Sequence, residues 1–338
     1  MERKRVIRLF LIFILMIVIP IYAQVALEKT GQAGMAFLSI PVGARASAMG
    51  NAFAAVSDNV EAMFWNPAGL GKVSKWDFSG GYTRWIADIT YYHAGLAYNV
   101  ENIGVFGLNL VWVDYGEIRG AIISRDPAGP GYELTDPISP LALVGGLAYG
   151  RQLTDRISFG ANMKWVYQDL GTSYSQKDSL SPLVAHESKL GIPALDVGVI
   201  YFTGFKDLRV AVSVQNVSYE KQFVDEDFSL PFNIRMGIAM DLLTIFAPDG
   251  NSSLLVSIDA THPRDYRERL HFGVEYSLFD IFFLRGGYKI NYDEDKLSFG
   301  IGLNPLSRDG MGIRFDYSFN PFGKLDSPVH RVSVGGSF

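Results

Sequence analysis

The chain has 338 residues, with 35 glycines, 13% aromatic residues, no cysteine and a formal net charge of −5. The lack of cysteine excludes a disulfide framework and a thiolate metal site, and the acidic balance argues against nucleic-acid binding. A glycine-rich and aromatic-rich composition with only 19% charged residues is typical of many strands and tight turns rather than of a helical bundle.

Residues 1–23 have the layout of a secretory signal peptide. Four basic residues open the segment: Arg3, Lys4, Arg5 and Arg8. An uninterrupted apolar run, Leu9–Ile19, follows, then Pro20 and a small residue, Ala23, at the expected cleavage position before Gln24. The alternative is an uncleaved anchor, which is disfavoured because eleven residues at ~1.5 Å each span about half of a ~30 Å hydrocarbon core. Cleavage would change the formal charge of the chain to −8.

Residues 24–74 are predicted to form a hatch inside a barrel built by the rest of the chain. The centre of this segment, Gly43–Leu70, is rich in alanine and glycine and almost free of β-branched residues. Ala48, Ala52 and Val56 fall four residues apart, which predicts a short helix with a small-residue face. The alternative, from these residues alone, is an exposed helical hairpin of a soluble protein.

Two further short turns are predicted within the hatch. Asp58, with Glu61 three residues later, resembles a capping box that opens a turn. Asn66 is placed to cap a last turn that has Pro67 at its first position. Arg45 is the cation of this region, and if it is buried it needs Asp58 or Glu61 as a partner.

From residue 75 onward the sequence repeats a period of two. Ile234 and Met236, for example, alternate with Arg235 and Gly237. One apolar and one polar face per segment is the pattern of a β-strand. About fourteen such segments are predicted: 75–83, 91–100, 103–114, 141–150, 156–169, 192–202, 207–217, 232–241, 252–262, 269–278, 281–290, 296–304, 311–319 and 329–338.

Segment length and loop length both favour a membrane barrel over a soluble sandwich. Several segments have ten or eleven residues, which matches the ~9–11 that a tilted strand needs to cross a bilayer, whereas soluble strands centre on ~5–6. The connections alternate between long ones, averaging about 13 residues, and short ones, averaging about 5. This is the arrangement of outer-membrane barrels, with both termini on the periplasmic side. Residues 75–338 are therefore predicted to form an all-β, antiparallel transmembrane barrel of about fourteen strands.

The inner face of this barrel is predicted to be polar and net basic, because lipid requires the apolar faces to point outward. The lumen-facing set contains seven cations and four anions: Lys164, Asp196, Arg209, Arg235, Asp259, Glu275, Arg285, Lys289, Arg314, Asp316 and Arg331. The hatch, with its acidic residues Asp58 and Glu61, is expected to fill this lumen. The terminal aromatic residue, Phe338, is expected to act as the assembly signal. The alternative is a soluble barrel whose last strand happens to end there.

The hatch also resembles the N-terminal signature of the PorV/PorQ family, which belongs with the FadL-like long-chain fatty-acid transporters. The residues that carry the resemblance are Gly43-Ala44-Arg45-Ala46, Met49-Gly50, Ala52-Phe53, Asp58-Asn59, Ala62 and Trp65-Asn66-Pro67-Ala68-Gly69-Leu70. The end of the chain, His330–Phe338, is similar to the ending of that family. The middle of the chain is similar only in architecture.

The resemblance implies a fourteen-stranded barrel with an N-terminal hatch, in which an Asn-Pro-Ala element is matched here by Asn66, Pro67 and Ala68. Candidate hatch or gating residues are Arg45, Asp58, Glu61, Asn66, Pro67 and Ala68. FadL-like proteins take hydrophobic ligands from the outer surface and release them by hatch movement or through a side opening. The PorV/PorQ branch also includes type IX secretion components that handle cargo at the cell surface, and the sequence does not separate these two roles.

No catalytic, metal or cofactor site is predicted. The five histidines lack metal-ligand spacing, and the chain has no Gly-x-Ser-x-Gly nucleophile elbow. The acidic runs 225–227 and 293–295 do not show the alternating ligand pattern of a calcium loop. The glycine pairs at 145–146 and 286–287 fall within predicted strands and not at phosphate-binding turns.

Three functions follow as hypotheses. The first is hatch-gated passage of hydrophobic small molecules, and the second is a type IX secretion scaffold that binds a protein through loops 115–140 and 170–191. The third, an outer-membrane enzyme, is the least favoured. Expected partners are outer-membrane lipid, the barrel assembly machinery and either a hydrophobic ligand or secretion-system proteins, but no nucleic acid. The expected location is the bacterial outer membrane, after export with a cleaved signal peptide.

Overall fold

The structure is a computed structural model that describes residues 33–124, 129–175, 184–223, 226–246, 251–305, 312–323 and 327–338. The predicted signal peptide, residues 1–23, and the start of the predicted hatch segment, residues 24–32, lie outside this described part. Within the described ranges, no helix is long and apolar enough to cross a membrane.

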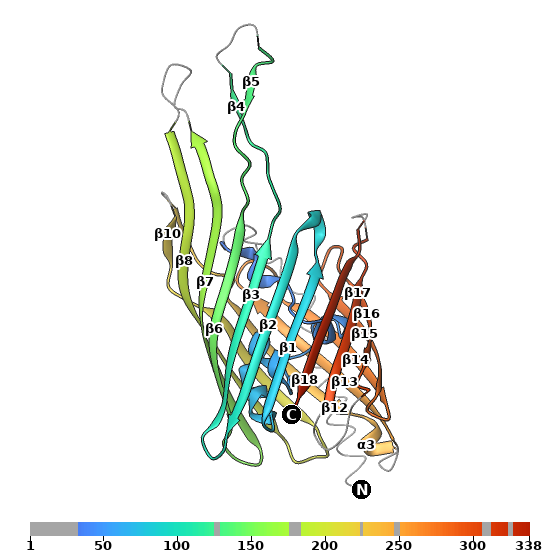
Figure 1. Ribbon diagram of the computed structural model, residues 1–338. Helices are drawn as coiled ribbons and strands as arrows, with labels where there is room; N and C mark the ends of the chain where they lie inside the picture. Colours follow the sequence, from blue (N-terminus) through green and yellow to red (C-terminus); the bar gives the residue numbers. More distant parts are fainter. Residues whose placement is uncertain are drawn as a thin grey trace.

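Fourteen strands form one closed antiparallel barrel (Figure 1). In sequence order they are β1 (Trp76–Arg84), β2 (Thr90–Val100), β3 (Gly104–Asp114), β6 (Leu141–Gln152), β7 (Ile157–Ser175), β8 (Val184–Phe202), β9 (Arg209–Val217), β12 (Asn233–Asp241), β13 (Ser252–Pro263), β14 (Arg269–Leu278), β15 (Phe282–Ile290), β16 (Leu297–Leu303), β17 (Gly312–Asn320) and β18 (Val329–Ser337). The first and last strands close the ring, with Asp77 opposite Ser337 and Arg84 opposite His330. The predicted barrel of about fourteen antiparallel strands is confirmed.

The outside of the barrel carries an apolar band. On β3, Leu108 and Trp112 are 55% and 51% exposed, whereas Val111 and Val113 are buried on the inner side. A soluble monomer rarely exposes one apolar patch larger than ~300–600 Å², but lipid covers such a band in a membrane barrel. Alternation along the sequence therefore sorts each strand into a lipid-facing and an interior face.

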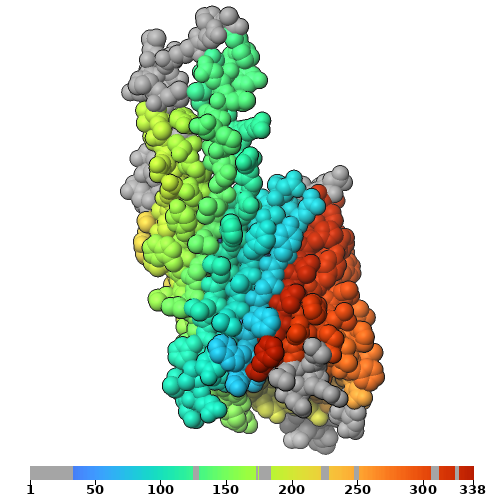
Figure 2. Space-filling model, in the orientation of Figure 1, coloured from blue at the N-terminus to red at the C-terminus, as the bar shows by residue number. Residues whose placement is uncertain are grey.

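β7 and β8 extend beyond the strands beside them, at the rim that carries the long loops. Their pairing continues to Ser175 opposite Val184. β6, in contrast, pairs with β7 only as far as Asp169, and β9 pairs with β8 only as far as Leu195. Figures 1 and 2 show the resulting extension rising well above the rest of the barrel.

The sequence underestimates this extension. It predicts that β7 ends at residue 169 and that β8 begins at residue 192, because the residues between them show no regular alternation. Those of them whose burial the structure describes are exposed or half-buried. Two short hairpins at the long-loop rim are also missed by the sequence: β4 (Ala121–Ile123) with β5 (Tyr132–Leu134), and β10 (Lys221–Phe223) with β11 (Glu226–Phe228). Three-residue strands are too short to show a period.

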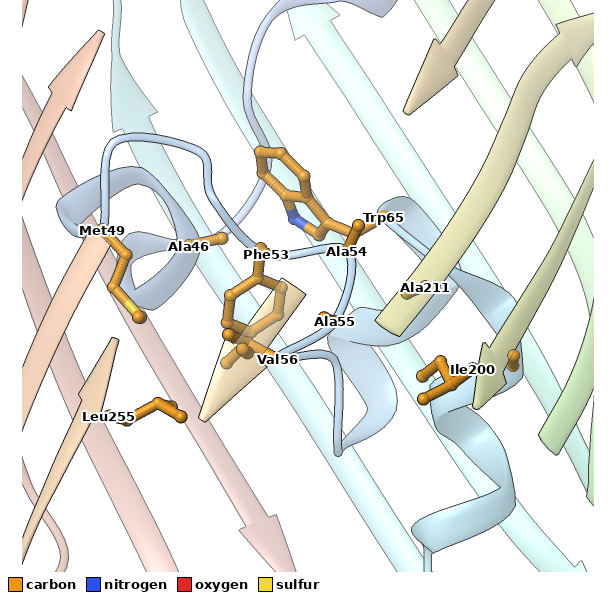
Figure 3. Close-up of a cluster of buried hydrophobic side chains, with 12 residues drawn as sticks. Ala46, Met49, Phe53, Ala54, Ala55, Val56, Trp65, Ile200, Ala211 and Leu255 are labelled. Carbon is orange, nitrogen blue, oxygen red and sulfur yellow. The ribbon is translucent and has the colours of Figure 1, made fainter. Parts of the chain in front are cut away.

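The hatch lies inside the barrel, where Figure 1 shows it in blue. Its helical elements are η2 (Ala36–Ser39), α2 (Ala44–Ala48), η3 (Val60–Phe64) and η4 (Pro67–Lys72). Two further short helices lie in connections between strands: η5 (Ile86–Asp88) and α3 (Leu243–Phe246). Figure 3 shows the core that joins hatch and wall, in which Phe53 and Trp65 of the hatch lie near Ile200 and Leu255 of the wall. The two aromatic rings meet edge to face at 5.9 Å.

Two details of the predicted hatch are wrong. The predicted helix through Val56 ends at Ala48, since Gly50 and Asn51 have left-handed backbone angles (φ 63° and 67°) that turn the chain. The predicted capping box does not form either. Asn59 caps η3 by accepting the N–H of Glu61, which leaves both carboxylates free for other partners.

The last predicted turn agrees with the structure. η4 begins at Pro67, and the side chain of Asn66 accepts the N–H of Ala68 at 3.2 Å. Proline is favoured at a first helical position because it has no N–H to leave unsatisfied.

Candidate functional site

The Asn-Pro-Ala turn of the hatch sits on a row of wall glycines. Gly150, Gly160 and Gly198 are cross-strand neighbours on β6, β7 and β8. A Cβ added at Gly160 would overlap the backbone of Pro67, and one at Gly198 would overlap the side-chain oxygen of Asn66. Only residues without side chains allow the hatch backbone to approach the wall this closely.

Hydrogen bonds hold this turn in place. The Asn66 amide donates to the carbonyl of Ala54 at 3.0 Å and to that of Val199 on β8 at 3.4 Å. The Ser158 hydroxyl on β7 donates to the carbonyl of Ala68 at 2.6 Å. Asn66 and Ser158 are both buried. The three predicted residues of this turn are thus anchors between hatch and wall, and their gating role stays a prediction.

The opposite side of the hatch is anchored by charged wall residues. Asp259 on β13 accepts the backbone N–H groups of Phe53 and Ala54, each at 2.9 Å. Arg235 on β12 donates to the carbonyl of Asn51 at 2.6 Å and to Asp259 at 3.3 Å. The loop between α2 and η3 therefore packs against an ion pair that is itself buried in the wall.

Arg45 forms the central ionic contact of the hatch. Its guanidinium donates to Asp58 at 2.7 Å and makes two bonds of 2.8 Å with Glu275 on β14. Arg285 on β15 also pairs with Glu275 and, on its other side, with Asp316. Removing one member of such a buried network leaves an uncompensated charge, which typically costs ~3–5 kcal/mol. Of the two partners considered for Arg45 in the sequence, the structure selects Asp58.

Glu61 has different partners. Its carboxylate accepts the Ser79 hydroxyl on β1 at 2.8 Å and lies 3.6 Å from Nε2 of His93 on β2. Another hatch contact on the same side is the bond from the Ala44 N–H to the Ser333 hydroxyl of β18, at 2.8 Å. Both contacts lie beside the seam between the first and last strands, so the hatch also bridges the closure of the barrel.

The polar set predicted to face the lumen lies on the interior side of the wall, buried or half-buried. Most of its charges are paired: Lys164 with Asp196, Arg235 with Asp259, Arg285 with Glu275 and Asp316, Lys289 with Asp295, and Arg314 with Asp77. Among the described residues, Arg209 and Arg331 have no carboxylate within ion-pair distance. Most of the predicted lumen charges are therefore neutralised by a partner, and these two arginines are not.

The chain end joins the barrel seam. Phe338 exchanges backbone hydrogen bonds with Trp76 at 2.9 and 3.0 Å. Its ring stacks on that of Phe78 at 6.0 Å and is half exposed on the outside. The position suits a residue that faces lipid, and its role as an assembly signal stays a prediction.

A cavity of about 130 Å³ lies between the hatch and the long-loop rim. One side is apolar, formed by the stretch 37–42 with wall residues such as Val111 and Val144. The other side is polar, and on it the Arg269 guanidinium lies between the rings of Tyr266 and Tyr292, 4.2 Å from each centroid. We refer to this cavity as the chamber.

Sequence reasoning predicted part of the polar side of the chamber, since Lys164, Asp196 and Arg235 line it. It missed the stack of Arg269 with two tyrosines. Tyr266 and Tyr292 lie in two different loops, and only the pairing of β14 with β15 brings those loops together. Asp265, beside Tyr266, is buried, and burial raises the pKa of its carboxyl although the nearby Arg264 opposes this change. The sequence carried one signal for this side of the chamber. A tyrosine stands shortly before β14 and another shortly after β15, so antiparallel pairing of these two strands would bring both rings to the same rim.

No cluster of three or more His, Asp or Glu side chains suitable for a metal ion occurs among the residues that the structure describes. The described anchors are hydrogen bonds, ion pairs and close backbone contacts. Their arrangement holds the hatch at several points around the wall.

These features define the chain as an outer-membrane β-barrel that contains a folded hatch. The family described as "Type IX secretion system membrane protein PorP/SprF" matches residues 119–335. The chain belongs to this family. No curated protein matches it in sequence.

Solved structures share the fold. The toluene transporter TbuX of Ralstonia pickettii is 16% identical with a TM-score of 0.55, over 87% of this chain and 97% of that one. The toluene transporter TodX of Pseudomonas putida is 13% identical with a TM-score of 0.58, over 88% and 96% of the two chains. CymD, a monoaromatic hydrocarbon channel, is 14% identical with a TM-score of 0.56, over 88% and 97%. At these identities the likeness concerns the fold.

Proposed function

We propose that this barrel serves type IX secretion by binding a protein of that system, or its cargo, on the extension at the long-loop rim. The observation that carries the proposal is the family match over residues 119–335, which includes the whole extension. In this proposal the long-loop rim faces the outside of the cell and both termini face the periplasm, as the contrast in loop lengths favours.

The extension and the neighbouring β4–β5 hairpin offer apolar surface beyond the band that lipid would cover. Ile123, Tyr132 and Leu134 of the β4–β5 hairpin are 81%, 53% and 63% exposed. Tyr174 and Val184, near the end of the β7–β8 ribbon, are about half exposed. Exposed apolar groups that cluster away from lipid are typical of protein–protein interaction sites.

Export assays in cells test this proposal. We would replace Ile123, Tyr132 and Leu134 with serine in one variant, and Tyr174 and Val184 with serine in a second. The amount of type IX cargo on the cell surface is expected to fall in at least one of them.

The matched control replaces Glu187 and Lys189 with serine. These two residues form an exposed ion pair on the same ribbon, and removing them leaves the apolar surface intact, so normal export is expected. Each barrel must keep its heat-dependent shift in gel mobility, which reports folding. Normal export by both apolar variants would contradict the proposal.

The chamber favours a second candidate, hatch-gated passage of hydrophobic small molecules. Its apolar side lies next to the hatch, and the toluene transporters share this fold. In this candidate the anchors Arg45, Asp58, Glu61, Asn66, Pro67 and Ala68 would have to release the hatch. Val144→Trp would fill the chamber and block uptake of a labelled aromatic hydrocarbon into proteoliposomes, whereas Leu147→Trp, on the lipid face of the same strand, would not.

The PorV/PorQ resemblance stays a proposal about the subfamily. It depends mainly on residues 43–70, which precede the matched range 119–335, and also on the ending, His330–Phe338. Exchanging this segment for that of a PorV/PorQ protein would preserve folding and export if the hatches are equivalent.

A further inference from the structure

A second recess, of about 440 Å³, opens at the short-turn rim, on the opposite side of the hatch from the chamber. The hatch contributes Lys72 to its lining, and the wall contributes three cations: Arg156, Lys206 and Arg209. Two acidic residues, Asp155 and Asp207, complete the charged lining. The recess thus spans the boundary between hatch and wall and has an excess of positive charge.

Arg209 is the buried cation of this recess. It is only 9% exposed, and its Nε is buried without a hydrogen-bond partner. Within the described ranges, no carboxylate lies within 4.0 Å of its guanidinium. Burying a charge without a partner is costly, so this site is short of one anion. Lys72 lines the same recess, with its ammonium 4.8 Å from the ring centroid of Phe202.

The nearby carboxylates are engaged elsewhere. Both oxygens of Asp207 accept the backbone N–H of Asp241, at 3.0 and 2.9 Å. Asp155 is largely exposed and lies 3.9 Å from Arg156. Asp58 of the hatch attracts Arg209 and Lys72 through space, but its ion pair is with Arg45. None of the three neutralises Arg209 directly.

We propose that the recess binds a phosphate group that bridges Lys72 of the hatch and Arg209 of the wall, and so holds the hatch closed from the short-turn rim. A guanidinium and an ammonium that converge on one anion are a usual phosphate-binding pair. Because Lys72 belongs to the hatch and Arg209 to the wall, movement of the hatch would separate the two cations and break up the site. A ligand that binds the closed state more tightly shifts the equilibrium toward it.

The phosphate has two sources, a soluble phosphate compound or the headgroup of a phospholipid at the membrane rim. The arms of the test separate them. The full chain is titrated with inorganic phosphate in a phosphate-free detergent and again in phospholipid nanodiscs. Binding in both media indicates a soluble ligand, and binding only in detergent indicates that lipid headgroups occupy the site in the nanodisc.

Variants identify the residues. Arg209→Gln is expected to weaken phosphate binding in detergent about tenfold or more, which corresponds to ~1.4 kcal/mol. Arg209→Lys is expected to weaken it less, because it keeps the charge but loses the planar fork. The control, Arg151→Gln, removes an exposed cation on β6 that does not line the recess, so its affinity should equal that of the unchanged chain.

Hydrogen exchange tests the effect on the hatch. Saturating phosphate is expected to slow amide exchange over residues 66–73 at least twofold in the unchanged chain and in Arg151→Gln, but not in Arg209→Gln. Gel mobility confirms that each variant is folded. Absence of phosphate binding in detergent, equal binding by Arg209→Gln, or binding without slower exchange of the hatch would each overturn the proposal. None of these results bears on type IX export.

Discussion

The side chain of Arg45 connects two segments of the hatch to each other and to the barrel wall. It pairs with Asp58 within the hatch and with Glu275 on the wall, and Glu275 in turn pairs with Arg285. The guanidinium also lies 5.4 Å from the ring centroid of Phe53. Because these groups are largely buried, the contribution of each to the stability of the fold depends on the presence of the others.

Arg45→Met tests this dependence. The change leaves Asp58 without its ion pair and Glu275 with only one cation, so we expect the free energy of unfolding to fall by about 3 kcal/mol. Denaturation in guanidinium would measure it. The control is Arg84→Met, which breaks only an exposed pair with Asp88 and should cost less than ~1 kcal/mol. Equal losses would mean that the hatch does not depend on the Arg45 network.

Gly160→Ala tests the close approach of hatch and wall. The new methyl group would overlap the backbone of Pro67, and overpacking of this kind typically costs ~1–3 kcal/mol. We expect lower stability together with faster amide exchange of η4. Gly145→Ala, where the added Cβ meets no atom within 4 Å, is the control on the neighbouring strand. An unchanged exchange rate in Gly160→Ala would contradict the contact.

At the scale of elements, the strands follow from the sequence much better than the hatch contacts do. Alternation is a local pattern, imposed on each strand by lipid outside and polar groups inside, so all fourteen barrel strands can be located from it. The contact of Asn66 with the barrel wall cannot be predicted from a local pattern. It requires Gly160 and Gly198 to be neighbours across two strands, which depends on a register that no local pattern encodes.

The hatch illustrates a second limit of local patterns. The four-residue spacing of Ala48, Ala52 and Val56 suits a helix, but these residues are small because each is buried where the hatch packs on the wall. Ala48 lies against Gly300 and Ala52 against Gly273. A buried segment without helical structure can therefore show the same spacing of small residues as one face of a helix. Asn66 and Pro67 were predictable because a cap and a first-turn proline act within a few residues.

At the scale of the whole molecule, the apolar exterior and the closed ring identify the solvent of this protein as lipid. Leu108→Arg would place a charge in the middle of the band, at a cost of ~2–4 kcal/mol. We expect less folded barrel after refolding into phospholipid vesicles, measured by gel mobility. Ile123→Arg, on the exposed β4–β5 hairpin, should refold normally. Equal yields would mean that lipid does not cover this face.

The most direct measurement of the central claim, a barrel whose lumen is closed by its own hatch, is conductance in planar bilayers. The chain from residue 24 to residue 338 is expected to conduct little, because the hatch is anchored at several points inside the barrel and most of the lumen charges are paired. Deletion of residues 24–70 is expected to raise single-channel conductance sharply. A large conductance in the chain that keeps its hatch, or no increase after the deletion, would contradict the account.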